Sequence, residues 1–221
     1  MKIKANGISI NYQVDGPDGA PWLVLSNSLA TNLTMWDDQA RELGRAFRVL
    51  RYDQRGHGLT EAPAGRYPFD LLIADALALM DALAIRKAHF GGLERIVVAQ
   101  AQGMEALVEP TIARWFPPDV IKANPPHVDK VRQMIRSTPV DGFIGCAAAL
   151  ADHDYAAAVA RVTRPVLFLV GEKDAAAPPM RKLNEALPGS RFVELAGAGH
   201  ISNLDQPEGF TRAVKDFLAA K

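Results

Sequence analysis

Apolar and polar positions along this chain predict strands that alternate with helices toward both ends of the sequence. Residues 8–14 alternate between apolar and polar side chains, as a strand with one buried face does. Further strands are predicted at 22–26, 48–53, 165–171 and 191–195. Helices are predicted at 69–84, 180–187 and 207–220. This alternation predicts an α/β protein with a mostly parallel sheet and helices on both faces.

The middle of the chain has a different pattern. Residues 101–160 are rich in alanine, helical in pattern and interrupted by prolines. We interpret this stretch as a helical cap over one edge of the sheet. The sequence therefore divides into an N-terminal core part at 1–100, a cap at 101–160 and a C-terminal core part at 161–221.

Composition is that of a globular protein with balanced charge. The 25 lysines and arginines equal the 25 aspartates and glutamates, so we expect neither nucleic acid nor membrane as a partner. We expect no signal peptide and no membrane-spanning segment, because no apolar run is long enough. The single cysteine, Cys146, excludes an intrachain disulfide, fits a cytoplasmic protein and is expected to be inert in the core.

Two polar residues follow successive predicted strands late in the chain. Asp174 comes after the strand at 165–171, and His200 lies in a glycine-rich segment after the strand at 191–195. Because sites form at the carboxyl ends of parallel strands, the two can meet, and the carboxylate would then fix the imidazole tautomer. Their order fits a hydrolase whose nucleophile precedes both. The alternative is a turn-forming Asp174 and a surface His200.

Loops after the two earlier strands offer weaker signals. The loop after residue 26 can aim backbone amides into a cleft, and Leu29, with Ser28 beside it, is the candidate oxyanion donor. A plain polar turn is the alternative. In the loop 53–58 we expect Arg55 to pair with Asp53, and we expect His57 to be exposed and non-catalytic.

These motifs, in this order, resemble the α/β-hydrolase superfamily. The matching segments are Leu25-Ser26-Asn27-Ser28-Leu29, Trp36-Asp37, the run from Arg51 to Gly58, Gly171-Glu172-Lys173-Asp174 and Gly199-His200. Together with the segment 103–116, they look most like the 3-oxoadipate enol-lactonases of aromatic breakdown. The resemblance implies a cofactor-free hydrolase that opens a small carboxylate-bearing lactone through an acyl-serine intermediate. It also implies a strand at 89–93 that leads into the serine.

The nucleophile elbow of that family, Gly-x-Ser-x-Gly, is absent from this sequence. Glu94 occupies the serine position, and Ile96 stands where a glycine is needed. We therefore expect one helix and one central strand to be missing, about 30 or more residues of a βαβ step. His200 then has no serine hydroxyl to activate. Glu94 as a carboxylate nucleophile and Ser28, which would point the wrong way, are the substitutes considered.

The carboxylate of an enol-lactone calls for a cation in the cap. Arg114, Arg132 and Arg136 are the candidates, and Trp36 and Trp115 could wall the pocket. Solvated helix faces and core packing are the respective alternatives. The histidines show no metal-ligand spacing and no phosphate-binding loop is present, so we expect neither metal nor cofactor.

Three interpretations of function follow. The first is an α/β-hydrolase-type enol-lactone or ester hydrolase that acts on a small molecule and keeps Asp174 and His200. The second is a non-catalytic binding domain that keeps the pocket without the chemistry, and the third is an aggregation-prone fragment. Turnover of an activated ester separates the first two, and cooperative thermal unfolding excludes the third.

Overall fold

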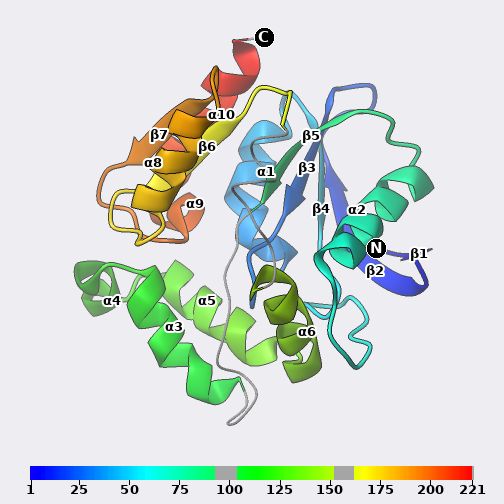
Figure 1. The fold of residues 1–221 in the computed structure, drawn as a ribbon, viewed down its shortest axis with the longest axis horizontal. Helices are drawn as coiled ribbons and strands as arrows, with labels where there is room; N and C mark the ends of the chain where they lie inside the picture. The colour runs from blue at the N-terminus through cyan, green and yellow to red at the C-terminus, as the bar shows by residue number, and fades with distance from the viewer. Residues whose placement is uncertain (93–103, 152–161, 221) are drawn as a thin grey trace. The chain divides into compact units, whose positions relative to one another are not determined.

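The structure is a computed structural model that describes residues 1–92, 104–151 and 162–220 (Figure 1). The chain divides into two compact units. The first comprises residues 1–109 and 130–153, and the second comprises residues 110–129 and 154–221. The division expected from the sequence, at 1–100, 101–160 and 161–221, stays a prediction.

The first unit is built on a sheet whose described strands run in the order β1-β2-β4-β3-β5. These strands are β1 (Lys2–Ala5), β2 (Ile8–Asp15), β3 (Trp22–Ser26), β4 (Arg48–Tyr52) and β5 (Ala88–Gly92). β2 pairs antiparallel with β1 and β4, whereas β3 pairs in parallel with both β4 and β5. The loop that carries Ser28 and Leu29 therefore leaves the carboxyl end of a strand with a parallel neighbour on each side.

Helices cover both faces of this sheet. Val24 and Leu50 pack in one core cluster with Ala76 and Leu79 of α2 (Phe69–Ala82). Because side chains alternate along a strand, Arg51 points to the opposite face, where it pairs with Asp37 of α1 (Asp37–Leu43). Figure 1 shows α1 and α2 on opposite sides of the sheet. The predicted α/β architecture is confirmed, whereas the expected gap near Glu94 lies outside the described residues.

The segment predicted to form a cap is helical where the structure describes it. Its elements are the short 3-10 helix η2 (Glu105–Leu107), α3 (Val108–Trp115), α4 (Pro118–Ala123), α5 (Pro126–Ser137) and α6 (Val140–Ala151). α6 packs directly against the loop after β4: a Cβ atom at Gly142 would lie 1.9 Å from the carbonyl oxygen of Gly56. Only a residue without a side chain permits this approach.

The second unit holds β6 (Leu167–Gly171) and β7 (Arg191–Leu195), which pair in parallel. Three helices accompany them: α8 (Ala177–Ala186), α9 (Ser202–Asp205) and α10 (Pro207–Ala219). α8 begins three residues before the predicted start at Met180, because Pro178 and Pro179 fit the first turn of a helix, where no amide hydrogen is needed. No helix in the described parts of the chain is long and apolar enough to cross a membrane.

Candidate active site

The side chains of Asp174 and His200 meet beyond the carboxyl ends of β6 and β7. The Nδ1 atom of His200 lies 2.9 Å from Oδ2 of Asp174, and both residues are buried. Parallel pairing sets Gly171 beside Leu195, so the two following turns start at the same edge of the sheet. The structure thus brings the two residues together, and their role in catalysis remains a prediction.

Asp174 divides its two carboxylate oxygens between its own turn and the histidine. Oδ1 accepts a hydrogen bond from the Ala176 amide at 3.0 Å, and Oδ2 faces His200. The Asp174 amide donates to the Gly171 carbonyl at 3.1 Å, and the Lys173 amide donates to the Ala198 carbonyl at 2.8 Å. The turn after β6 is therefore tied to the loop after β7, which fixes the carboxylate beside the imidazole.

The loop that carries His200 is held mainly through its backbone. The His200 amide donates to the Trp115 carbonyl at 2.7 Å, and the two rings lie with centroids 5.5 Å apart. The Gly199 amide donates to the buried carboxylate of Asp205 at 2.7 Å, and that carboxylate also contacts His127 Nε2 at 3.2 Å. A Cβ atom at residue 199 would lie 2.2 Å from the Trp115 carbonyl, so this approach requires glycine.

The Nε2 atom of His200 is buried and has no hydrogen-bond partner among the described residues. A neutral imidazole that donates its Nδ1–H to a carboxylate presents a lone pair at Nε2. The carboxylate of Asp174 also stabilises the imidazolium that forms when Nε2 takes a proton. The pair has the geometry of a general base and lacks a described donor for it to act on.

In the first unit, the loop after β3 forms a tight turn at Ser28–Thr31. The Thr31 amide donates to the Ser28 carbonyl at 3.1 Å, and Ala30 has a φ of 59°. The Ser28 amide is engaged with the sulfur of Met35 at 3.4 Å. Among the described residues, the Leu29 amide donates no hydrogen bond. The Leu29 amide is therefore open, and its role as an oxyanion donor stays a prediction.

Polar side chains from the loop after β4 hold that turn in place. The Ala30 amide donates to His57 Nε2 at 3.0 Å, and the Leu33 amide donates to Asp53 Oδ1 at 2.7 Å. The expectation of an exposed His57 is wrong, since its exposed fraction is 0%. The loop folds inward because Gly58 lets the chain wrap Asp53, where a Cβ would lie 2.2 Å from Oδ2.

The expected pairing of Arg55 with Asp53 is also wrong. Arg55 pairs with Asp75 of α2 through two hydrogen bonds of 2.7 Å, and both side chains are buried. Asp53 instead accepts hydrogen bonds from Asn11, at 2.7 Å, and from the Leu59 amide, at 2.9 Å. Because Asp53 is saturated with uncharged donors, the guanidinium of Arg55 takes the buried carboxylate on the neighbouring helix.

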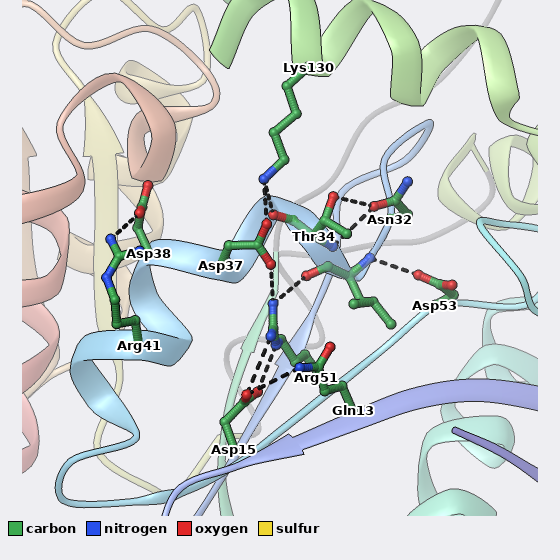
Figure 2. Close-up of polar contacts among 11 residues, drawn as sticks. Gln13, Asp15, Asn32, Thr34, Asp37, Asp38, Arg41, Arg51, Asp53 and Lys130 are labelled. Atoms are coloured by element: carbon green, nitrogen blue, oxygen red, sulfur yellow. Dashed lines mark hydrogen bonds and ion pairs between the residues drawn. The ribbon is translucent and has the colours of Figure 1, made fainter. Parts of the chain in front are cut away.

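A charged cluster secures the far end of the loop, beside the 3-10 helix η1 (Leu33–Trp36). Figure 2 shows Lys130 and Arg51 approaching the Asp37 carboxylate from opposite sides. Lys130 Nζ also donates to the Thr34 carbonyl at 2.6 Å. Burial acts to raise the Asp37 pKa, but hydrogen bonds from Lys130 and Arg51 outweigh it and lower that pKa from 3.8. Lys130 thus ties α5 to this loop.

The predicted substrate-binding residues occupy different surroundings. Trp36 is buried in the first unit, and Trp115 is buried against the ring of His200. Arg132 pairs with Glu109 at 2.8 Å and Arg136 with Glu105 at 2.9 Å, so both cations already have acidic partners. Arg114 is exposed. The proposed contacts of all five residues with a substrate remain predictions.

Three further residues were either not predicted from the sequence or lie outside the described residues. Glu94 falls outside the described residues. Asp205 was missed, although its place between His200 and the helix that starts at Pro207 is a usable signal. Lys130 was missed because nothing in a helical pattern shows which lysine reaches a distant carbonyl. Within the described ranges, no three His, Cys, Asp or Glu side chains gather as metal ligands.

The fold places this chain among the α/β hydrolases. The model of the alpha/beta hydrolase family matches residues 18–213, and the chain belongs to that family. It is 30% identical to 3-oxoadipate enol-lactonase 2 of Acinetobacter baylyi, over 96% of this chain and 94% of that protein. It is also 30% identical to a putative carbamate hydrolase RutD of Pseudomonas savastanoi, over 91% of this chain and 95% of the relative.

Solved structures give the same picture. The enol-lactonase from Burkholderia xenovorans LB400 has a TM-score of 0.94 and 34% identity, covering 99% of this chain and 100% of that one. A hydrolase from Pseudomonas aeruginosa PA01 has a TM-score of 0.91 and 35% identity, covering 99% of this chain and 97% of that one. The resemblance to enol-lactonases inferred from the motifs is thereby confirmed.

The Acinetobacter match is longer than this chain. It runs over 252 residues, whereas 96% of these 221 residues is about 212. The relative therefore has about 40 residues without counterparts here. This excess supports the prediction, made from the absent Gly-x-Ser-x-Gly motif, that a segment of about 30 or more residues is missing.

Proposed function

We propose that this chain hydrolyses small carboxylate-bearing enol-lactones or esters, with His200 as a general base toward water. One observation carries the proposal: His200 is held by Asp174 at 2.9 Å through Nδ1, while its Nε2 is buried without a described partner. Membership of the alpha/beta hydrolase family supports the reaction class. The names of the enol-lactonase relatives support the substrate class.

In the proposed reaction, His200 Nε2 takes a proton from water, and the hydroxide oxygen adds to the lactone carbonyl carbon. The tetrahedral intermediate carries its negative charge on the former carbonyl oxygen, for which the Leu29 amide is the proposed donor. The ring C–O bond then breaks, and the imidazolium returns its proton to the leaving enolate oxygen. One water is consumed, and one carboxylic acid and one enol are formed. Asp174 stabilises the imidazolium between the two proton transfers.

The rate of this route is expected to be low. A serine enzyme splits the reaction into two easier steps, whereas water must here attack directly. Hydrolases that lose a triad member keep about 10³–10⁴-fold acceleration over water from the remaining groups. We expect turnover in that residual range.

The biological setting follows from the proposed substrate. We propose a role in aromatic-compound catabolism through the β-ketoadipate route, supported by the names of the relatives. A cytoplasmic location is supported by the free, buried thiol of Cys146, since such a location keeps thiols reduced. Arg114, Arg132 and Arg136 are the proposed partners of the substrate carboxylate, and the latter two would exchange their glutamate partners for it.

Hydrolysis of 3-oxoadipate enol-lactone and of p-nitrophenyl acetate tests the proposal. We expect turnover above the buffer rate for both, lost in His200→Ala and retained in the control His89→Ala. We also expect a preference for the carboxylate-bearing lactone over a neutral lactone of the same ring size. Turnover that is unchanged by His200→Ala would contradict the proposal.

A non-catalytic binding domain is the second candidate, and the missing elbow serine favours it. Such a domain would bind 3-oxoadipate, which titration calorimetry measures. The unsubstituted chain would then hydrolyse the substrate only at the buffer rate, and His200→Ala would leave that rate unchanged.

A further inference from the structure

The turn at Ser28–Thr31 contains a backbone conformation that its sequence does not favour. The Thr31 amide closes the turn on the Ser28 carbonyl at 3.1 Å, which makes Ala30 its third residue. Ala30 has a φ of 59°, whereas glycine or asparagine is the usual residue where the third position of a turn has positive φ. A flip of the peptide between Leu29 and Ala30 would return Ala30 to negative φ. Something else must therefore hold that peptide.

His57 holds that peptide through a hydrogen bond. The Ala30 amide is 3.0 Å from Nε2 of His57, and a backbone amide can only donate. Nε2 must therefore be the unprotonated nitrogen, and the hydrogen of the neutral imidazole must be on Nδ1. Nδ1 lies 3.2 Å from the Arg55 carbonyl, which accepts that hydrogen. The two contacts together select one tautomer of a fully buried ring.

We propose that His57 is a positioning residue whose neutral Nε2 locks the Leu29–Ala30 peptide and thereby keeps the Leu29 amide available as the oxyanion donor. The peptide is planar, so fixing the direction of the Ala30 N–H also fixes ψ of Leu29 and φ of Ala30. Those two angles set the shape of the turn that presents the Leu29 amide. The inference rests on the proposed function, in which that amide stabilises the oxyanion.

The groups around His57 keep its imidazole neutral at neutral pH, so that Nε2 accepts the hydrogen bond from the Ala30 amide. Burial lowers the His57 pKa from 6.5, although the Arg55 carbonyl and the charge of Asp53 act to raise it. From α6, the Cys146 sulfur lies 4.0 Å from Nδ1. Burial raises the pKa of that thiol to about 12, so it brings no charge to the ring. Protonation of Nε2 in acid removes the acceptor and places a second N–H opposite the Ala30 N–H. The hydrogen bond that fixes the Leu29–Ala30 peptide is then lost.

Nuclear magnetic resonance of the ¹⁵N-labelled chain tests the lock without any need for turnover. Between about pH 7.5 and pH 5, we expect the Ala30 amide shift to titrate with the His57 imidazole, at a midpoint below 6.5. In His57→Gln the side-chain amide oxygen accepts the same hydrogen bond and does not titrate, so the Ala30 shift should stay constant. An Ala30 signal that stays flat through the imidazole titration of the unsubstituted chain would overturn the proposal.

Turnover of p-nitrophenyl acetate tests the link to catalysis. We expect His57→Leu to lower kcat about tenfold with little change in KM, and His57→Gln to retain most of kcat. Adding Ala30→Gly to His57→Leu should recover part of the loss, because glycine adopts positive φ without a lock. The control His89→Leu should leave kcat unchanged.

The outcomes separate the two proposals. A chain without turnover would defeat the proposed function, and the Ala30 titration would still decide whether His57 holds the turn. A chain with turnover, a titrating Ala30 and an unchanged kcat in His57→Leu would overturn the positioning role. If His57→Leu does not fold, the titration of the unsubstituted chain and the His57→Gln variant carry the test.

Discussion

The loop that carries His200 and the loop that follows β3 are held in different ways. The first is held mainly through its backbone: the Gly199 amide donates to Asp205, the His200 amide donates to the Trp115 carbonyl, and further hydrogen bonds tie the loop to the turn after β6. The second is fixed by buried or charged side chains along its length: His57, Asp53, Asp37 and Lys130.

This difference shows where each part is vulnerable. The hold of Trp115 on His200 runs through a carbonyl, so side-chain substitution at 115 leaves that hydrogen bond in place. In the His200 loop, substitution can remove the carboxylates of Asp174 and Asp205, and that of Glu172, which accepts from the Gly197 amide at 2.8 Å. In the loop after β3, removal of the His57 or the Asp53 side chain leaves the Ala30 or the Leu33 amide without its acceptor in a buried setting, which costs stability.

The largest expected effect on turnover comes from changing Asp174, the hydrogen-bond partner of the His200 imidazole. Asp174→Asn would present a side-chain amide to Nδ1 and favour the wrong tautomer, with the hydrogen on Nε2. We expect ester turnover to fall about 10³-fold, or to the buffer rate if that is reached first. Initial rates with p-nitrophenyl acetate measure this. A fall of less than tenfold would mean that Asp174 only shapes its turn.

Next comes Asp53, which joins three parts of the first unit. Asp53→Ala removes the acceptor for Asn11 and for the amides of Leu33 and Leu59. Buried donors left unpaired cost about 1–3 kcal/mol each, so we expect the free energy of unfolding to fall by about 3 kcal/mol or more. Urea denaturation measures it, with the exposed Asp81→Ala as the matched control. Equal midpoints for the two variants would show that the network is dispensable.

A smaller effect is expected at Asp205. Asp205→Ala leaves the Gly199 amide and His127 without their shared acceptor, which loosens the backbone beside His200. We expect kcat for p-nitrophenyl acetate to fall about tenfold, equivalent to about 1.4 kcal/mol. Asp205→Asn keeps an acceptor oxygen and should recover much of the rate, whereas the exposed Asp216→Ala should change nothing. No rescue by asparagine would count against the positioning role.

The smallest effect is expected at Lys130. Lys130→Met keeps the aliphatic stem and loses the ion pair with the half-exposed Asp37, worth about 0.5–1 kcal/mol after solvent screening. The lowered Asp37 pKa makes this contribution complete above about 3.8, and it fades as the pH falls through the folded-state pKa. Urea unfolding at neutral pH and in acid measures both. A difference from the unsubstituted chain that grows in acid would contradict the assignment.

Local pattern sufficed for the strands and for the residues that follow them. Asp174 and His200 were found because each follows a predicted strand, and parallel strands bring such residues together. The burial of His57 could not be found in this way, since a histidine between two glycines is typical of an exposed loop. Its burial depends on Gly142 of α6, which is distant in sequence and packs against Gly56.

The choice of ion-pair partners could not be predicted from the sequence either. Arg55 stands two residues from Asp53, yet it pairs with Asp75 of α2, because uncharged donors already occupy the Asp53 carboxylate. The acidic partners of Arg132 and Arg136 likewise depend on how η2 and α3 lie against α5. Sequence spacing identifies charged residues, and packing decides which of them meet.

The time course of p-nitrophenolate release on mixing this chain with p-nitrophenyl acetate tests the central claim most directly. General-base catalysis by His200 on water predicts a line from the first turnover, with a slope above buffer that His200→Ala abolishes. A burst that matches the protein concentration would reveal a covalent intermediate, such as one on Glu94, and would contradict the account. A slope equal to that of buffer would contradict it as well.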